Sequence, residues 1–356
     1  MKSHLSSSLL CALAILPLSA PVLNAASLVP SAGYSVGEVL STTTLGAFDI
    51  YDAGGAKAYG WDSGSSTLRN YSVSNGGVLG DFGAPPGGYA DSGNAFVSFV
   101  RRSSDGNSVW VGFTVGGNSD DRIYEVTDLG GTPTWNLRTT LAGNYDLEFS
   151  SSGAAFASAN LGGFSNPNKL FYLDAGDGFS AIEFAETGGY SADLAFDVTG
   201  ALIYATSGLG AEQLVSFSNG NITAFLSDTG SWSPLGLGDA SLLSDLPAGG
   251  SGLYADAFGG VFVSMSDFSG FPFAGTVAQW NGNAGSGENL DILATVGDSL
   301  GELDGLGELA NGGELFQSVG YGGSGLDTIS VPEPADFGLA AGLLSLALIA
   351  VRRRRA

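Results

Sequence analysis

The chain has almost no cysteine or histidine. Of its 356 residues one is Cys and one is His, and both, Cys11 and His4, lie near the N-terminus. If that segment is removed on export, no thiol and no imidazole remain. Their loss excludes Cys–His nucleophiles, Ser–His–Asp triads, disulfides, and zinc sites built on His or Cys. A hydrolase built on this chain would need a bound metal ion or a carboxyl group whose pKa is raised by burial.

Basic residues are scarce between the two ends. The sequence holds 12 Lys and Arg against 35 Asp and Glu. The terminal segments contain Lys2, Arg352 to Arg355, Glu333 and Asp336, so seven basic and 33 acidic residues lie between them, a formal charge of −26. Such a surface repels nucleic acid and anionic lipid, which are bound through positive charge. We interpret the excess as solubilising, because scattered carboxylates do not by themselves build a Ca²⁺ cage.

Long hydrophobic runs are absent, and the two short ones lie at the ends of the chain. The run LLCALAILPL at 9–18 follows Lys2 and precedes small residues. This pattern predicts a secretory signal peptide at 1–25, cleaved after Ala25 or Ala26. It also indicates export of the protein through the inner membrane.

The second run, FGLAAGLLSLALIAV at 337–351, carries no charge. As a helix it would extend about 22 Å, short of a roughly 30 Å hydrocarbon core. The basic stop that follows, which predicts a cytoplasmic C-terminus, consists of Arg352, Arg353, Arg354 and Arg355.

A proline-rich motif precedes this run and consists of Val331, Pro332, Glu333 and Pro334. The two prolines disfavour a helix and should keep the motif extended and accessible. The motif, the short hydrophobic helix and the basic stop at 331–356 resemble the PEP-CTERM sorting tail of Gram-negative bacteria. The resemblance implies a membrane processing enzyme, exosortase, as a partner, with cleavage near the motif and delivery to the cell surface or the exterior. Membrane contact would then be limited to the helix before processing; the alternative is a simple single-pass anchor.

Between the two ends, residues 26–330 show six segments of strand–turn–strand character with Gly at each turn. The turn glycines are Gly55, Gly106, Gly153, Gly200, Gly260 and Gly313. Their intervals of 47 to 60 residues suit β-propeller blades, which run about 40–50 residues with four antiparallel strands each. The sequence therefore predicts an all-β, six-bladed β-propeller, with a β-sandwich as the competing fold and no helix in this region. The order and spacing of strands and turns resemble those of NHL, YWTD and lactonase-type propellers, a resemblance of architecture only.

No catalytic residue, metal site or cofactor is predicted. The stretch DAGDG at 174–178 offers Asp174 and Asp177 as oxygen donors for Ca²⁺. It lacks the spacing of an EF-hand loop, so an Asp-Gly turn is the simpler interpretation. The sequence thus favours a secreted protein that is not an enzyme and that binds or supports an extracellular polysaccharide matrix. The alternative is a metal-dependent hydrolase or lactonase, which would require at least three Asp, Glu or Asn side chains to converge on the face of the propeller channel.

Overall fold

The computed structural model describes residues 28–330, apart from 41–44, 52–56, 74, 88–95, 115–119, 162–166, 191, 268–273, 297–302, 307–313 and 320–324. The predicted signal peptide, the VPEP motif, the hydrophobic run and the basic stop lie outside the described residues. In the described part of the chain, no helix is long and apolar enough to cross a membrane.

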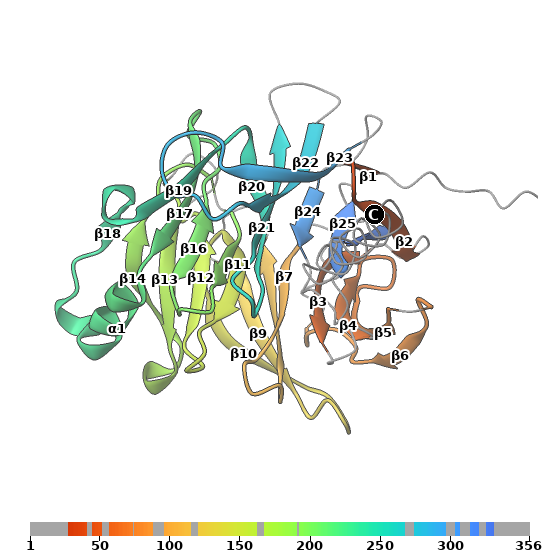
Figure 1. The fold of residues 1–356 in the computed structure, drawn as a ribbon. Helices are drawn as coiled ribbons and strands as arrows, with labels where there is room; N and C mark the ends of the chain where they lie inside the picture. The colour runs from red at the N-terminus through yellow and green to blue at the C-terminus, as the bar shows by residue number, and fades with distance from the viewer. Residues whose placement is uncertain are drawn as a thin grey trace, which may run out of the picture.

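The described strands form six sheets, numbered here in chain order (Figure 1). Sheet 1 contains β3 (Leu45–Tyr51), β4 (Lys57–Asp62), β5 (Thr67–Ser72) and β6 (Val78–Asp81). Sheet 2 contains β7 (Phe96–Arg102), β8 (Val109–Thr114), β9 (Arg122–Thr127) and β10 (Thr134–Thr140). Sheet 3 contains β11 (Asn144–Phe149), β12 (Ala155–Ala159), β13 (Lys169–Asp174), β14 (Ser180–Glu186) and the short parallel β18 (Leu235–Gly236).

Two of the remaining three sheets also contain a strand from the N-terminal end of the described chain. Sheet 4 contains β15 (Leu194–Phe196), β16 (Leu202–Ala205), β17 (Glu212–Phe217) and β19 (Ser241–Leu246). Sheet 5 contains β20 (Gly249–Ala255), β21 (Val261–Asp267), β22 (Ala274–Trp280), β23 (Leu290–Val296) and β1 (Leu28–Pro30). Sheet 6 contains β24 (Leu303–Leu306), β25 (Glu314–Val319), β26 (Gly325–Ser330) and β2 (Ser35–Leu40).

The first strand of each sheet contacts the first strand of the next. These contacts run from β3 through β7, β11, β15, β20 and β24 and return to β3. We call these six the inner strands. The second strand of the chain, β2, completes sheet 6 by pairing with the last described strand, β26. Antiparallel sheets arranged radially around an axis are the architecture of a β-propeller, which confirms the predicted fold class.

The hydrophobic core is divided among the spaces between consecutive sheets. One cluster, with Trp61 and Phe113, lies between sheets 1 and 2, and another, with Trp110 and Leu147, between sheets 2 and 3. Three further clusters fill the next three spaces, up to Leu28 and Ile329 between sheets 5 and 6. Sheets 2 to 5 are therefore buried on both faces, and the aromatic side chains in these spaces pack largely in edge-to-face pairs.

The Gly turns recur at equivalent places, between the first and second strands of a sheet. In four sheets the carbonyl of one residue accepts a hydrogen bond from the Gly N–H three residues later, at 2.8–3.3 Å, and the Gly has positive φ. The pairs are Ser103–Gly106, Ser150–Gly153, Asp197–Gly200 and Asp256–Gly259. The turn of sheet 5 thus uses Gly259 rather than the predicted Gly260, while Gly55 and Gly313 lie outside the described residues. A left-handed turn residue explains the Gly at each place.

One helix corrects the prediction that this region is free of helices. Helix α1 spans Asn219–Ser227, between β17 and β19 (Figure 1). A capping box starts it: the Ser218 hydroxyl accepts from Asn221 N–H at 3.2 Å, and the Asn221 side chain accepts from Ser218 N–H at 3.1 Å. Ile222 and Phe225 are buried. Its Gly, Asn and Thr have weak helix propensity, which concealed it; capping and packing stabilise it instead.

Candidate active site on the inner strands

Five charged residues gather on the inner strands of sheets 1 to 4. They are Asp49 on β3, Arg101 on β7, Asp146 and Glu148 on β11, and Asp193 just before β15. All four carboxylates interact electrostatically with Arg101. We call this set the inner-strand cluster. In a propeller the inner strands surround the central channel, so the cluster lies where this fold can present chemistry to a ligand.

Arg101 is the centre of the cluster. Its Nη2 lies 2.9 Å from Asp146 Oδ1, and its Nε lies 3.0 Å from the Leu147 carbonyl oxygen and 3.4 Å from Glu148 Oε2. Burial alone would lower the pKa of Arg101, but the attraction of the four carboxylates outweighs it and holds the pKa above its ordinary value. The guanidinium is therefore a permanent positive charge, and Nη1 makes no hydrogen bond to any residue that the structure describes.

Glu148 is the group in the cluster that is suited to proton transfer. Burial raises the pKa of Glu148 to about 7; Arg101 opposes the shift, and Asp146 and Asp49 add to it. Its side chain keeps 27% of its surface exposed, against 2% for Asp146. A carboxyl group that is partly exposed and titrates near neutrality can act as a general base or acid at physiological pH.

The two aspartates that face Arg101 most closely already have backbone partners. Asp146 Oδ2 accepts from Leu194 N–H at 3.0 Å, and Asp49 Oδ2 accepts from Arg102 N–H at 2.6 Å. Burial raises the pKa of Asp49, while Arg101 and the Arg102 N–H oppose the shift. Glu148 Oε1 also accepts from a backbone N–H, that of Phe149 at 2.9 Å, but this is the next residue of its own strand. The two aspartates instead link the inner strand of one sheet to a neighbouring inner strand, and so they position the cluster.

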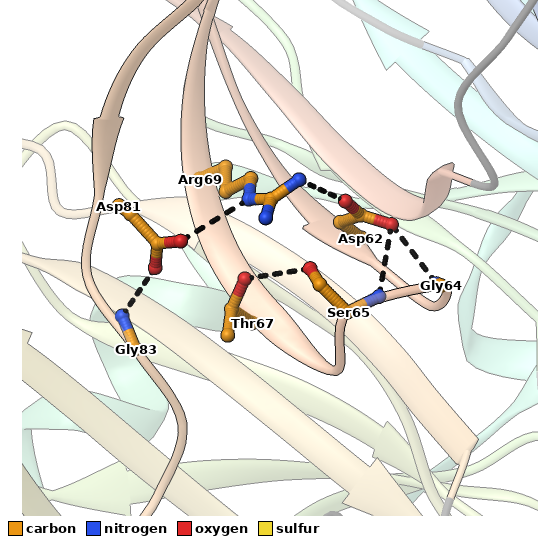
Figure 2. A network of polar contacts seen from close by, with 7 residues as sticks. All are labelled: Asp62, Gly64, Ser65, Thr67, Arg69, Asp81 and Gly83. Atoms are coloured by element: carbon orange, nitrogen blue, oxygen red, sulfur yellow. Dashed lines mark hydrogen bonds and ion pairs between the residues drawn. The ribbon is translucent and has the colours of Figure 1, made fainter.

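A second arginine network shows what a purely structural arrangement looks like in this chain (Figure 2). Arg69 on β5 bonds Asp62 and lies 3.3 Å from Asp81. Asp62 also accepts from Gly64 N–H at 2.9 Å and Asp81 from Gly83 N–H at 2.8 Å, which fixes two chain reversals. Here each carboxylate caps a turn, and the network joins β4, β5 and β6 within one sheet.

A divalent cation does not fit the inner-strand cluster as it stands. The Arg101 guanidinium occupies the position between Asp146 and Glu148, and backbone N–H groups occupy the second oxygens of Asp146 and Asp49. Within the described ranges, no group of three or more His, Cys, Asp or Glu side chains is arranged to hold a metal ion.

The two residues suggested for Ca²⁺ lie in the hairpin between β13 and β14, within sheet 3. Asp174 Oδ1 accepts from Gly176 N–H at 2.9 Å, and Asp177 Oδ2 accepts from the Ser180 hydroxyl at 3.0 Å. Both contacts belong to a turn that ends at Gly178 with φ of 61°.

Sequence reasoning missed the inner-strand cluster, although the repeats contained a signal. Arg101 and Glu148 each lie five residues before the turn glycine of their own sheet, and Asp146 and Asp193 each lie seven before theirs. Aligning the repeats on these glycines would have placed Arg101 level with Glu148 on adjacent inner strands. The same alignment would have placed Asp146 level with Asp193.

Comparison with known proteins extends the fold assignment. No family model matches the chain, and no curated protein matches it. A PQQ-bound aldose sugar dehydrogenase from Streptomyces coelicolor superposes with a TM-score of 0.58 at 16% identity, over 85% of this chain and all of that one. The calcium-binding protein regucalcin from Agrobacterium tumefaciens gives 0.54 at 12%, over 83% of this chain and 93% of that one. A protein assigned as a gluconolactonase gives 0.51 at 14%, over 84% and 93%.

These comparisons contradict the expectation that the protein is not an enzyme. Structures with the same fold include a sugar dehydrogenase and a protein assigned as a lactonase, so the fold gives no ground for excluding catalysis. The expectation rested on the absence of His, Cys and any carboxylate spacing that specifies a site, and it overlooked Glu148. A binding or structural role in a polysaccharide matrix finds no support among these structures.

Proposed function

We propose that the protein is a hydrolase that opens uncharged lactones or esters at the inner-strand cluster, with Glu148 as general base. One observation carries this proposal: a partly exposed Glu148, whose pKa is raised to about 7, lies beside the permanent positive charge of Arg101. Acyl hydrolysis needs a proton acceptor for water and a positive group for the oxyanion, and these two residues supply both.

The reaction would proceed in two steps. Ionised Glu148 takes a proton from a water molecule while the water oxygen forms a bond to the carbonyl carbon, and the carbonyl π electrons move to its oxygen. Arg101 stabilises that oxyanion. The oxyanion then collapses, the bond from the carbon to the ring oxygen breaks, and the leaving oxygen takes the proton from Glu148. Water is thereby added across the ester bond, and no further reactant is needed.

The likeness to a protein assigned as a gluconolactonase makes sugar lactones the first substrates to test. The surroundings favour uncharged ones, because Asp49, Asp146 and Asp193 would repel an anion. The proposed reaction needs no metal ion, and the carboxylates of the cluster already bind Arg101 and backbone N–H groups.

The experiment is a titration of the acid that gluconolactone hydrolysis releases, using purified residues 26–330 and a blank for spontaneous hydrolysis. Glu148→Gln should lower the rate by about 10²–10⁴-fold. Asp174→Asn, a matched carboxylate change in the β13–β14 hairpin, should leave it unaltered. Full activity in Glu148→Gln would refute the role of Glu148, and loss of wild-type activity in EDTA would refute a mechanism without a metal.

We also propose that the six sheets are six blades of one closed propeller and that the protein is exported. The ring of inner-strand contacts supports closure. The apolar run at 9–18 supports a signal peptide at 1–25, and the order of motif, helix and arginines at 331–356 supports recognition by an exosortase-type enzyme. The substrate would then be met at the cell surface or outside the cell.

A further inference from the structure

We propose that Asp49 is a positioning residue of this site: it aligns Arg101 through the backbone of Arg102 and supplies a negative charge directed at Glu148. The proposal rests on the function proposed above, and it concerns a residue on β3, two sheets away from Glu148 on β11.

The alignment begins with a hydrogen bond between sheets. Asp49 Oδ2 accepts from Arg102 N–H at 2.6 Å, so a carboxylate of β3 holds the main chain of β7 next to Arg101. The Arg102 side chain returns toward β3: its guanidinium lies 5.1 Å from the centre of the Tyr51 ring, and Tyr51 stacks on Tyr59 at 4.3 Å. The end of β7 is therefore attached to sheet 1 at two points, through its backbone and through a side chain.

The same chain of contacts continues across the next two strands. Arg101 reaches from β7 to Asp146 Oδ1 and the Leu147 carbonyl on β11. Asp146 in turn uses its other oxygen, Oδ2, to hold Leu194 N–H on β15. Charged hydrogen bonds thus join four consecutive inner strands, and Asp49 is at the end of the series. A displacement of β7 relative to β3 would move the Arg101 guanidinium away from Glu148.

The charge of Asp49 acts on Glu148 in addition to this alignment. The charged groups around Glu148 are Arg101 on β7, Asp146 on β11 itself and Asp49 on β3; Asp193, before β15, acts on Arg101. Burial is the main cause that raises the pKa of Glu148, and the negative charges of Asp146 and Asp49 raise it further. Removal of the Asp49 charge should therefore lower this pKa, because ionised Glu148 would meet less repulsion.

Two substitutions separate the two roles. Asp49→Asn keeps an oxygen that can accept from Arg102 N–H but removes the charge, whereas Asp49→Ala removes both. Glu186→Gln, a surface carboxylate on sheet 3 that pairs with Lys169, is the matched control for a change in charge alone. The readouts are the ¹³C chemical shift of the Glu148 carboxyl against pH, which needs no substrate, and the pH profile of gluconolactone hydrolysis.

In Asp49→Asn we expect the Glu148 midpoint and the acidic limb of the rate profile to move down together by roughly 0.5–1 pH unit. Asp49→Ala should show the same shift and a further loss of about tenfold in the rate on the alkaline plateau, because Arg101 is no longer aligned. Glu186→Gln should match the wild type. If Asp49→Ala does not fold, the shift in Asp49→Asn alone decides.

An unchanged Glu148 midpoint in Asp49→Asn would overturn the inference, even if that variant were less stable. If the midpoint moves but neither wild type nor variant hydrolyses any lactone or ester, the effect of the Asp49 charge on Glu148 holds and the proposed function fails. If Glu148→Gln abolishes hydrolysis while Asp49→Asn changes neither readout, the function holds and the inference fails.

Discussion

At the level of single residues, the chemistry of this chain depends on where its few arginines lie. Arg69 pairs with Asp62 and Asp81 within one sheet, and each of those carboxylates also caps a turn. Arg101 instead faces four carboxylates from two other inner strands and the approach to a third. In that setting one carboxyl, Glu148, ends with a pKa near neutrality. Burial thus gives one glutamate a pKa in the range in which histidine ordinarily titrates.

The raised pKa of Glu148 makes a prediction for stability. The folded state holds the Glu148 proton more tightly than the unfolded chain, whose pKa is the ordinary value for glutamate. Folding therefore loses stability as pH rises from about 4.5 to about 7, because over this range the glutamate of the unfolded chain is ionised while folded Glu148 still holds its proton. Glu148→Gln, which cannot ionise, should be more stable than wild type by about 1–3 kcal/mol at pH 8 and nearly equal to it at pH 4.5.

Denaturant unfolding at the two pH values measures this difference. Equal effects of Glu148→Gln at pH 4.5 and pH 8 would mean that Glu148 is not held in its neutral form. Asp174→Asn serves as the control, since its carboxylate lies in a hairpin turn.

The same pKa fixes the direction of the pH dependence of catalysis. A general base must be ionised, so hydrolysis should rise with pH and reach a plateau above the Glu148 midpoint, at about pH 7. Initial rates of ester hydrolysis, corrected for the spontaneous reaction, give this profile. A rate that falls through neutrality would indicate that Glu148 acts as an acid instead.

At the level of strands and turns, the fold followed from local signals and the site did not. Gly106, Gly153 and Gly200 mark equivalent turns because each occupies a left-handed position, a requirement that appears directly in the sequence. The cluster arises from contacts between strands about 50 residues apart, such as Arg101 with Asp146, which no local pattern reports. Helix α1 was missed for a similar reason, since burial of Phe225 against other sheets outweighs its weak propensity.

The pairing of β2 with β26 in sheet 6 is a second feature that the sequence does not reveal. Ser35 of β2 lies opposite Ser330 of β26, although the two are almost 300 residues apart. Directly opposed residues of an antiparallel pair have Cα atoms about 4.5–5.5 Å apart, which is within the range that a disulfide can bridge. Because residues 26–330 contain no cysteine, two engineered cysteines could pair only with each other within the chain.

We predict that Ser35→Cys/Ser330→Cys forms an intrachain disulfide under oxidising conditions and stabilises the protein by about 2–4 kcal/mol. Thiol counting by mass spectrometry detects the bond, and thermal unfolding with and without reductant measures its effect. Each single variant should keep a free thiol and melt as the wild type does. Two free thiols in the oxidised double variant would show that β2 and β26 are not paired in solution.

At the level of the whole molecule, the negative charge agrees with the proposed chemistry and the proposed export. Ester or lactone hydrolysis creates a carboxylate, and a domain with a formal charge of −26 repels an anionic product once it forms. The absence of cysteine after Cys11 also means that an oxidising exterior neither helps nor harms the fold.

The proposed cleavage of the C-terminal tail leads to a prediction about the mature protein. Strand β26 ends at Ser330, and the VPEP motif begins at Val331. Cleavage near residue 332 would therefore remove the hydrophobic run and the arginines while leaving every residue pair of sheet 6 intact. Protein collected outside the native cell should have an intact mass that corresponds to an end near residue 332. Retention of Arg352 to Arg355 in most of that material would contradict processing.

Two truncations test whether the fold tolerates this cut. Residues 26–332 should melt cooperatively, with almost purely β circular dichroism apart from the short α1. Residues 26–324 lack β26, the strand that lies between β25 and β2, and should fail to fold because its loss leaves β2 with no strand to pair with in sheet 6. If 26–324 were as stable as 26–332, the pairing of β26 with β25 and β2 would not be needed for the fold, and the position of the cut would have no structural reason.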